Sequence, residues 1–454
     1  MPSIHFITQG CSANQADSEI MQGILKENGY SFSSREDDAD IVVLNSCTVK
    51  GPTLSFFKRK MKELEGKNKK IIVTGCIPQS NRNFEHLNSH SLVGTYQIDK
   101  IGEAVDRTLE GDTITLLEKE NKRRLNLPKA RINPLIEIVP ILQGCLSSCT
   151  FCKTKHARGN AFSQSPEDIV RHISWAAREG AREIWLTSQD NSVYGLDFGM
   201  NGKGSMNLAG LLKQICAIPR EFMVRVGMAN PKYILPMIDE LIAAFKNPKV
   251  YKFLHVPLQS GSDNVLEDMK RGYSTGDFCA IIKKFRKEIP HITISTDIIC
   301  GFPTETRGDF KKTVEILKET RPDVINTSKF WPMQGTPAAR MKQVNGAERK
   351  ERAKEMTELH KKIALRNNNR WVGWEGDVLF DERGKNGTWK GRNFAYKQVV
   401  VDSKEDLMGR NVVVRITNGS LIDLRGRVLN YCGLQPAGFL PNSRSGLIGN
   451  STAD

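Results

Sequence analysis

Alternation between short apolar runs and helical patterns is the feature that most constrains how this chain folds. Between residues 135 and 333, six runs have the length and β-branched content of buried parallel strands. The expected strands are Ile136–Leu142, Glu183–Thr187, Met223–Val226, Phe253–Pro257, Thr293–Ile299 and Val324–Phe330. The expected helices between them include Pro166–Glu179, Leu208–Ala217, Tyr233–Ala244, Thr275–Lys287 and Gly308–Glu319. Six such units predict an α/β barrel or partial barrel with reactive groups at the C-terminal strand ends.

The segments on either side of this region have different patterns. Strand patterns at Ile4–Thr8, Ile41–Leu44 and Ile71–Thr74 alternate with helical ones, which predicts an N-terminal doubly wound parallel sheet. Beyond a charged helix, Ala347–Arg370, short alternating runs with Gly, Asn and Asp turns predict a small all-β barrel. The expected parts are an N-terminal domain (1–118), a basic linker (119–133), a central domain with its trailing helix (134–370), a β-domain (371–432) and an irregular tail (433–454).

Composition limits the class of protein. With 39% apolar residues and no apolar run long enough to cross a bilayer, we expect a soluble protein without membrane association. The N-terminus lacks a signal-peptide layout, so we expect a cytoplasmic chain whose ten cysteines are thiols or metal ligands. The formal net charge of +15 fits a nucleic-acid partner, and equally a basic surface that is merely solvated.

Three closely spaced cysteines, Cys145, Cys149 and Cys152, form a C-x3-C-x2-C motif in GCLSSCTFC, directly after the first expected barrel strand. Three thiolates can hold three irons of a four-iron cluster and leave the fourth iron open. The amino and carboxylate groups of S-adenosylmethionine can chelate such an iron, which indicates radical chemistry. A structural zinc site is the alternative, but it needs a fourth ligand, and only His156 is nearby.

A second set of cysteines is dispersed in sequence but equivalent in position. Cys11, Cys47 and Cys76 each directly follow one of the three N-terminal strands. Because the C-terminal ends of parallel strands share one edge of a sheet, these thiols can converge on a second cluster. The remaining cysteines do not repeat this pattern and fit core or incidental roles, namely Cys216, Cys279, Cys300 and Cys432.

These motifs resemble those of the radical S-adenosylmethionine methylthiotransferases, from about residue 3 to residue 430. In the N-terminal part, the stretches that resemble the family's cluster-binding segments are GCSANQADSE, LNSCTVK and TGCIPQ. In the central part, the stretch that resembles its radical motif is GCLSSCTFCKTKHARGN. Three more segments of this chain resemble other signatures of the family, namely LHVPLQSGSDNVLEDMKRGY, TDIICGFPTET and GTPAA. The β-domain resembles the TRAM domain, a small tRNA-binding barrel.

Within this family, NSCTVK and KTKHARG are similar to the archaeal and eukaryotic branch. That resemblance implies conversion of N6-threonylcarbamoyladenosine at position 37, in the anticodon loop of tRNA, to its 2-methylthio derivative. It also implies two 4Fe-4S clusters and S-adenosylmethionine as cofactors, with an electron donor and a sulfur source as partners. We expect a monomer without the C-terminal membrane anchor that eukaryotic members often carry.

One stretch departs from the family pattern. The usual Y-S-x-R-P-G-T corresponds here to residues 330–336, in which Met333 replaces the arginine and Gln334 the proline. If that arginine contacts substrate or cofactor, the contact is lost or is supplied by another residue.

Polar residues after the expected strands are the candidate contacts to the cofactor, although each also fits a hydrogen-bonding role at a barrel mouth. They are Gln189, Asp190, Arg225, Gln259 and Ser260. Cations after the radical motif are candidates for the threonylcarbamoyl carboxylate or the tRNA backbone. They are Lys153, Lys155 and Arg158, with His156 equally suited to a structural role. Phosphate contacts are expected from the linker, from the helix 349–370 and from the β-domain.

Three other interpretations stay open at this stage. A sister enzyme would methylthiolate isopentenyladenosine in tRNA or an aspartate of a ribosomal protein. A radical-type protein that binds RNA only as a regulator would keep its clusters as redox sensors and form no 5′-deoxyadenosine. A zinc-stabilised RNA-binding protein would contain zinc and be colourless.

Overall fold

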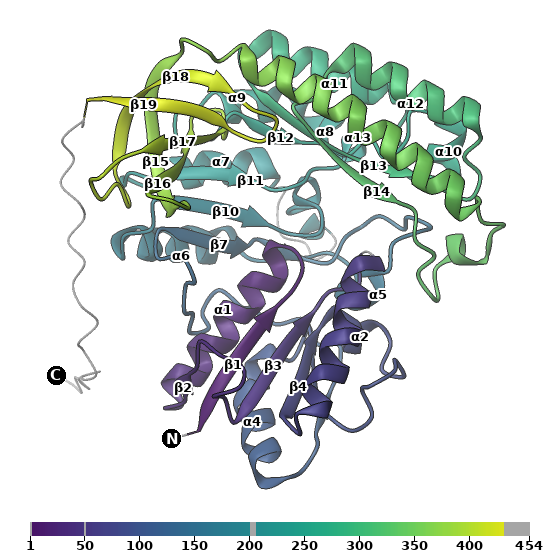
Figure 1. Cartoon of the computed structure of the whole chain (residues 1–454), viewed down its shortest axis with the longest axis vertical. Helices are drawn as coiled ribbons and strands as arrows, with labels where there is room; N and C mark the ends of the chain where they lie inside the picture. The colour runs from purple at the N-terminus through teal and green to yellow at the C-terminus, as the bar shows by residue number, and fades with distance from the viewer. Residues whose placement is uncertain (1, 50, 200–205, 431–454) are drawn as a thin grey trace.

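A six-stranded parallel sheet forms the N-terminal part of the chain in a computed structural model that describes residues 2–49, 51–199 and 206–430 (Figure 1). The strand order β2-β1-β3-β4-β5-β6 confirms the predicted doubly wound sheet. Its strands are β1 (Ser3–Thr8), β2 (Ser31–Phe32), β3 (Ile41–Ser46), β4 (Lys70–Gly75), β5 (Ser91–Gly94) and β6 (Thr115–Leu116). The sequence patterns did not predict β2, β5 and β6, which are too short to show a strand period.

Helices cover both faces of this sheet, so alternate residues of one strand enter different cores. On β3, Val43 packs into the cluster that contains Ile20 and Met21 of α1, whereas Val42 and Leu44 pack with Phe57 of α2. Burial on both faces explains why the strand sequences are continuously apolar. The covering helices are α1 (Ser12–Glu27), α2 (Gly51–Gly66), α3 (Cys76–Ser80), η1 (Ile98–Lys100) and α4 (Ile101–Glu110).

The six central strands form a partial barrel, as predicted. Two parallel sheets, β7-β10-β11 and β12-β13-β14, meet where Tyr251 N donates to Val224 O (2.9 Å) and Ala229 N donates to His255 O (2.9 Å). The strands are β7 (Ile136–Pro140), β10 (Glu183–Thr187), β11 (Met223–Val226), β12 (Phe253–His255), β13 (Thr293–Cys300) and β14 (Val324–Lys329). A short pair, β8 (Leu142–Gln143) and β9 (Phe162–Ser163), follows β7.

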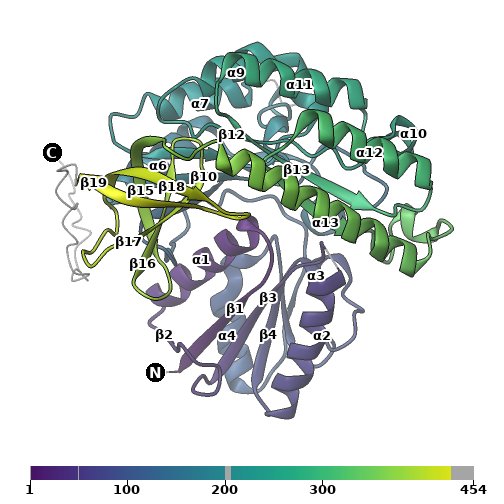
Figure 2. The ribbon, with the colours of Figure 1, turned by 45° about the horizontal axis from the view of Figure 1, so that its top comes forward.

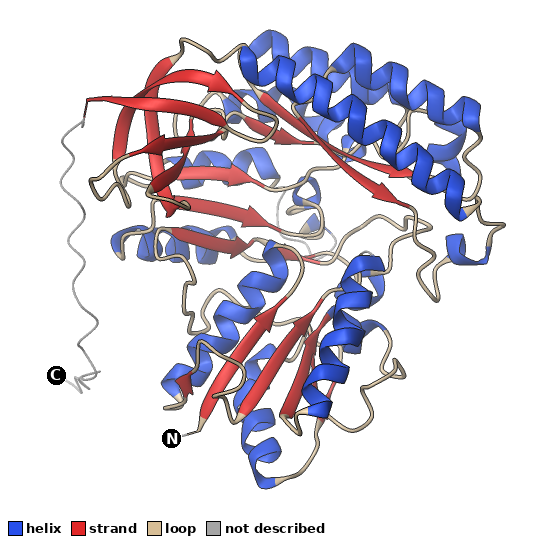
Figure 3. Cartoon of the chain, viewed as in Figure 1, coloured by secondary structure: helices blue, strands red, loops and turns tan. Residues whose placement is uncertain are grey.

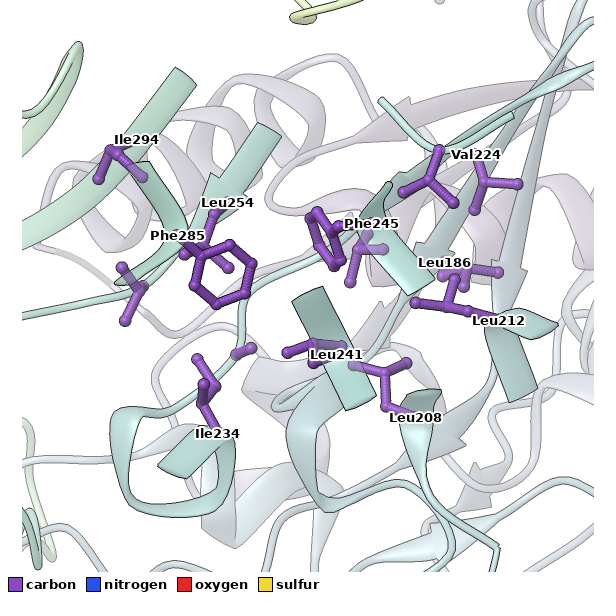
Figure 4. Close-up of a cluster of buried hydrophobic side chains, with 14 of the residues drawn as sticks. Leu186, Leu208, Leu212, Val224, Ile234, Leu241, Phe245, Leu254, Phe285 and Ile294 are labelled. Carbon is purple, nitrogen blue, oxygen red and sulfur yellow. The ribbon is translucent and has the colours of Figure 1, made fainter. Parts of the chain in front are cut away.

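Helices enclose the outside of the partial barrel (Figure 3). Leucine and phenylalanine side chains such as Leu212, Leu241, Phe245 and Phe285 fill the space between helices and strands (Figure 4). The helices are α5 (Thr154–Arg158), α6 (Pro166–Arg178), η2 (Asn191–Val193), α7 (Leu208–Cys216), α8 (Pro231–Ile234), η4 (Leu235–Met237), α9 (Ile238–Phe245), α10 (Asp263–Asp268), α11 (Thr275–Glu288), α12 (Arg307–Thr320), η5 (Pro337–Arg340) and α13 (Gly346–Asn369). Over the described ranges, no helix is both long and apolar enough to span a membrane.

One predicted helix is divided. The expected helix Tyr233–Ala244 is replaced by α8, η4 and α9, so the prediction of a single helix was wrong. Pro236 lies in η4 and has no backbone N–H to donate, which interrupts the regular helical hydrogen bonds at this point.

The C-terminal strands close into a five-stranded barrel, which confirms the predicted all-β fold. This barrel packs against the N-terminal ends of the central strands, where Lys252 N donates to Phe394 O (2.8 Å) and Lys397 pairs with Asp323 (2.8 Å). Figure 1 shows it at the left, next to the tail ends of the β7 and β10 arrows, and Figure 2 shows the same arrangement from another side. Its strands are β15 (Glu375–Arg383), β16 (Thr388–Asn393), β17 (Gln398–Asp402), β18 (Asn411–Gly419) and β19 (Leu424–Asn430). Cys432 and the predicted tail lie outside the described residues, and the predicted domain boundaries stay a prediction.

A buried network of charges joins the N-terminal sheet, the linker and the central barrel. Lys129 of the linker pairs with Glu19 of α1 (3.2 Å) and with Glu137 of β7, and its side chain is 4% exposed. The backbone follows the same path, because Ala130 N donates to Glu19 O (2.8 Å). Gly23 permits this approach, since a Cβ there would lie 2.3 Å from Lys129 N. The linker is therefore packed between the two parts.

We expect Lys129→Met to destabilise the protein by about 3–5 kcal/mol, because the buried Glu19 would lose its cation. Glu137, in contrast, keeps Arg131 and His172 as partners. Urea unfolding followed by circular dichroism measures this change. The matched control is Lys246→Met, whose half-exposed pair with Glu288 (2.8 Å) is screened by solvent, so its loss should change the stability much less. Equal losses for the two variants would contradict the role of the network.

Candidate active site between two sheet edges

The radical-type motif lies in the loop that follows β8. Cys145 N donates to Gly159 O (3.2 Å), and Cys152 N donates to Cys149 O (3.1 Å), so the loop folds back on itself. Gly144 has a φ of +80°, and a Cβ there would meet Asn160 O at 2.0 Å, so this position requires glycine. The loop thus holds its three cysteines at the C-terminal end of the central strands, where the sequence placed them.

Charged side chains from other loops contact these cysteines. Arg271 Nη1 donates to Cys149 Sγ (3.0 Å), and Asp190 Oδ2 lies 4.0 Å from Cys145 Sγ. Burial, and then the charge of Asp190, raises the pKa of Cys145 to about 11. Sequence reasoning did not identify Arg271 as an individual residue, although it lies within the family signature ending in MKRGY.

The second cysteine set converges at the edge of the N-terminal sheet. Cys11 caps α1 after β1, Cys47 follows β3, and Cys76 begins α3 after β4. The buried amide of Asn14 lies among them, with its Oδ1 3.9 Å from Cys11 Sγ and 3.7 Å from Cys76 Sγ. A Cβ at Gly10 would lie 2.8 Å from Cys47 Cβ, so that glycine admits the third cysteine.

The two sheet edges that carry these cysteines face each other. The arrowheads of β1, β3 and β4 point toward the central barrel in Figure 1. Ser12, next to Cys11, shares a hydrogen bond with Thr187 at the end of β10 (2.6 Å between hydroxyl oxygens). Helix α5, which follows Cys152, packs against α3, which begins at Cys76. The two cysteine sets are therefore on opposite sides of one junction.

A buried carboxylate with two cations crosses this junction. Asp17 of α1 pairs with Arg158 of α5 (2.7 Å) and with Arg124 of the linker (3.1 Å), and all three side chains are buried. Arg158 also donates to Asn14 Oδ1 (3.0 Å), the amide oxygen beside Cys11 and Cys76. Burial raises the pKa of Cys76, and the positive charge of Arg158 partly opposes that rise.

The donor sets fit iron–sulfur clusters. Among the described residues each set offers three thiol ligands, which would leave one iron of a four-iron cluster open. Across the described parts of the chain, no group of three or more His, Cys, Asp or Glu side chains is arranged to hold a single metal ion. Each thiolate of a four-iron cluster binds a different iron, so a cluster spaces its ligands more widely than one ion does.

Four of the predicted cofactor contacts lie in loops after β10 and β12. Gln189 Oε1 accepts a hydrogen bond from Gly144 N (2.6 Å), next to Cys145, and Asp190 lies beside that cysteine. Gln259 has a left-handed backbone (φ 68°), and its buried Oε1 has no partner among the described residues. Ser260 is fully buried and accepts a hydrogen bond from Ser262 N (3.3 Å). The orphan oxygen of Gln259 is suited to a ligand with a hydrogen-bond donor.

The fifth predicted contact, Arg225, has different surroundings. Its guanidinium lies over the rings of Trp185, Phe253 and Tyr396, at 5.4, 5.4 and 5.5 Å from their centroids. Tyr396 belongs to the C-terminal barrel, so Arg225 stabilises the contact between the two barrels. Its role as a cofactor contact stays a prediction.

Family models match three successive segments of the chain. Residues 3–94 match the uncharacterized protein family UPF0004, residues 139–317 the radical SAM superfamily, and residues 370–429 the TRAM domain. The threonylcarbamoyladenosine tRNA methylthiotransferase of Xenopus laevis is 41% identical over 92% of this chain and 76% of its own length. The protein of that name from Drosophila melanogaster is 42% identical over 93% and 77%.

The chain belongs to the threonylcarbamoyladenosine tRNA methylthiotransferase family. Among solved structures, the radical S-adenosylmethionine methyltransferase TsrM from Kitasatospora setae has a TM-score of 0.53 over 74% of this chain and 75% of its own. Its sequence identity of 14% makes this a likeness of fold alone.

The stretch in which this methylthiotransferase departs from its family joins the two halves of the site. Met333 is buried, and Gln334 Oε1 accepts a hydrogen bond from Asn81 Nδ2 of the N-terminal part (3.3 Å). Trp331 packs on Gly51 at the start of α2, where an added Cβ would lie 2.4 Å from the indole ring. Residues 331–334 therefore form an additional contact between the central barrel and the N-terminal sheet.

The cations after the radical motif have separate surroundings. Lys155 donates to the carbonyl oxygen of Cys145, Arg158 pairs with Asp17, and Lys153 is buried beneath Gly335. Burial, followed by the charge of Lys153, lowers the pKa of His156. Arg158 is held inside the protein, away from solvent, and its predicted contact with tRNA stays a prediction.

We expect Asp17→Asn to destabilise the methylthiotransferase by about 3–5 kcal/mol, because two buried guanidinium groups would lose their counter-ion. Hydrogen exchange should accelerate in both α5 and the linker, since Asp17 binds a cation from each. The matched control is Asp112→Asn, which breaks a half-exposed pair with Arg107 (2.9 Å). Protection of α5 at the wild-type level in Asp17→Asn would contradict the proposed connection.

Proposed function

We propose that this methylthiotransferase converts N6-threonylcarbamoyladenosine at position 37 of tRNA to 2-methylthio-N6-threonylcarbamoyladenosine. The observation that carries the proposal is the convergence of two cysteine triplets on facing sheet edges, bridged by the buried pair of Asp17 and Arg158. Family membership supports the choice of substrate. We also propose that the enzyme acts in the cytoplasm as a monomer.

The two triplets have different tasks in this proposal. Cys145, Cys149 and Cys152 hold the cluster that binds S-adenosylmethionine, and the Cys11, Cys47 and Cys76 set holds a second one. When bound, the first cluster would supply the electron that cleaves S-adenosylmethionine, and the second would supply the sulfur atom for C2 of the adenine. An external electron donor would reduce the clusters again, and an external sulfur source would replace the transferred sulfur. A second S-adenosylmethionine supplies the methyl group.

The protein itself supplies position and a shielded environment. Arg271 orients Cys149, and Gln189 orients the Cys145 loop through the backbone of Gly144. The Asp17–Arg158 pair keeps the facing sheet edges at a fixed separation. The reacting groups are therefore held in position before the reaction, and little further conformational entropy is lost when they meet. These residues act on the ligands of the clusters and thereby tune their environment.

The C-terminal barrel offers a surface for the tRNA backbone. Arg415 on β18 lies directly opposite Arg427 on β19, so the two side chains project from the same face. Arg415 also pairs with Glu375 of β15 (2.5 Å), which reduces the repulsion between the two arginines. Phosphate contacts from such surface cations supply much of the affinity for tRNA. We propose this arginine pair as a contact to the anticodon arm of tRNA.

We expect Cys47→Ala to abolish methylthiolation while 5′-deoxyadenosine still forms, because the radical motif stays intact. Mass spectrometry of nucleosides from treated tRNA detects the product. The reconstituted variant should contain about four irons, and the wild type about eight. The control is Cys279→Ala, a partly buried cysteine of α11 outside both sets.

Methylthiolated adenosine from Cys47→Ala would refute the two-cluster proposal. Wild-type enzyme that modifies isopentenyladenosine and leaves threonylcarbamoyladenosine unchanged would assign the chain to the sister activity. Wild-type enzyme that forms no 5′-deoxyadenosine under reducing conditions would refute the radical proposal altogether.

We expect the double variant Arg415→Gln/Arg427→Gln to weaken tRNA binding and to reduce the slope of log K against log salt concentration by about two. Binding titrations at several salt concentrations measure the slope. The control is Lys311→Gln/Lys318→Gln, which removes two charges from the exposed face of α12. An unchanged slope in the double variant would exclude the arginine pair from the interface.

A further inference from the structure

One cation at the junction of the two cysteine sets has no partner among the residues that the structure describes. Lys153 directly follows Cys152, and only 8% of its surface is exposed. Within residues 2–49, 51–199 and 206–430, no ion pair or hydrogen bond engages its ammonium group. The packing around this side chain excludes much of the surrounding water, so an anion that reaches the ammonium group would be bound in a partly desolvated site.

Neighbouring cations have partners within the protein. Lys155 donates to the carbonyl oxygen of Cys145, and Arg158 pairs with Asp17 at 2.7 Å. Arg271 donates to Cys149 Sγ at 3.0 Å. These three groups maintain the loops that carry the cysteines. Lys153 differs from them because its charge is left available for an external anion.

Lys153 lies close to a loop of the central barrel that also contacts the N-terminal part. Its Nζ lies 3.4 Å from the place that a Cβ on Gly335 would occupy, in the loop after β14. The adjacent Gln334 contacts Asn81 of the N-terminal part (3.3 Å), and α5 packs against α3. The ammonium group therefore lies where the radical motif, the N-terminal sheet and the loop after β14 meet.

We propose that Lys153 binds the carboxylate of the threonylcarbamoyl group and thereby selects this nucleoside over adenosines with an apolar N6 substituent. This inference rests on the proposed function and identifies the residue that determines its substrate. The carboxylate would supply the missing counter-ion in a site from which most water is excluded. An isopentenyl group would leave the ammonium buried and unpaired, which penalises the wrong substrate.

Two other anions have the same chemistry as this carboxylate. One is a phosphate of the tRNA backbone, and the other is the carboxylate of S-adenosylmethionine. A matched pair of RNA ligands separates these sources. One is an anticodon stem-loop with N6-threonylcarbamoyladenosine, and the other is the same stem-loop with that carboxyl group blocked as its methyl ester.

The test measures the affinity of reconstituted full-length enzyme for both stem-loops without reductant. We expect the wild type to prefer the free acid over the ester by about tenfold or more. Lys153→Met should lose this preference, because the acid binds more weakly and the ester binds as well as to the wild type or better once the unpaired ammonium is removed. The affinity for S-adenosylmethionine should be unchanged. Retained ester binding also shows that the variant is folded. Lys153→Arg should retain part of the preference, and the exposed Lys311→Met should retain all of it.

Three results would overturn the inference. Lys153→Met that keeps the preference for the acid excludes Lys153 as the selecting group. Equal weakening of both stem-loops assigns Lys153 to a phosphate, and weaker binding of S-adenosylmethionine assigns it to the cofactor. Methylthiolation of the acid stem-loop by the wild type is measured separately, with reductant. If it occurs alongside one of these three binding results, the role of Lys153 is refuted and the proposed function stands. If the wild type forms no methylthio product, the proposed function fails and this inference fails with it.

Discussion

The buried carboxylate of Asp17 is the contact on which the arrangement of this site depends. It accepts one cation from the helix behind the radical motif and one from the linker, while its own helix begins next to Cys11. Three segments distant in sequence thus meet at one side chain. Since the loss of either partner of a buried ion pair destabilises the protein, none of these three segments can move independently of the others. The separation between the two cysteine sets follows from this constraint.

Much of the fold was predictable because local patterns and tertiary packing agree. Strand β10 was predicted to the residue, since its apolar run has no polar interruption and is bounded by turns. Strand β5 was missed because Ser91–Gly94 contains only two large apolar residues. The division of the Tyr233–Ala244 helix was missed although Pro236 was visible, because the apolar period continues across it.

The site was predictable to the extent that it follows from topology. Cys11, Cys47 and Cys76 share one edge because parallel strands place their C-terminal ends together, a rule that needs no contact information. The partners of the cations could not be predicted in this way. Lys153, Lys155 and Arg158 belong to one short basic run, yet Lys155 contacts a carbonyl, Arg158 a carboxylate, and Lys153 neither within the described residues. Asp17 lies 141 residues before Arg158, so that pairing is visible only in the folded chain.

The facing of two sheet edges has a consequence for how a nucleic acid is handled. A base that remains stacked in an anticodon loop lies directly against its neighbouring bases. Both cysteine sets lie at a junction that is bridged by the contacts Ser12–Thr187 and Asp17–Arg158, so neighbouring bases would collide with the protein there. A nucleotide processed there has to swing out of its stack and enter alone. The energy of unstacking then becomes part of recognition, so flexible loops are favoured over helical RNA before any base is read.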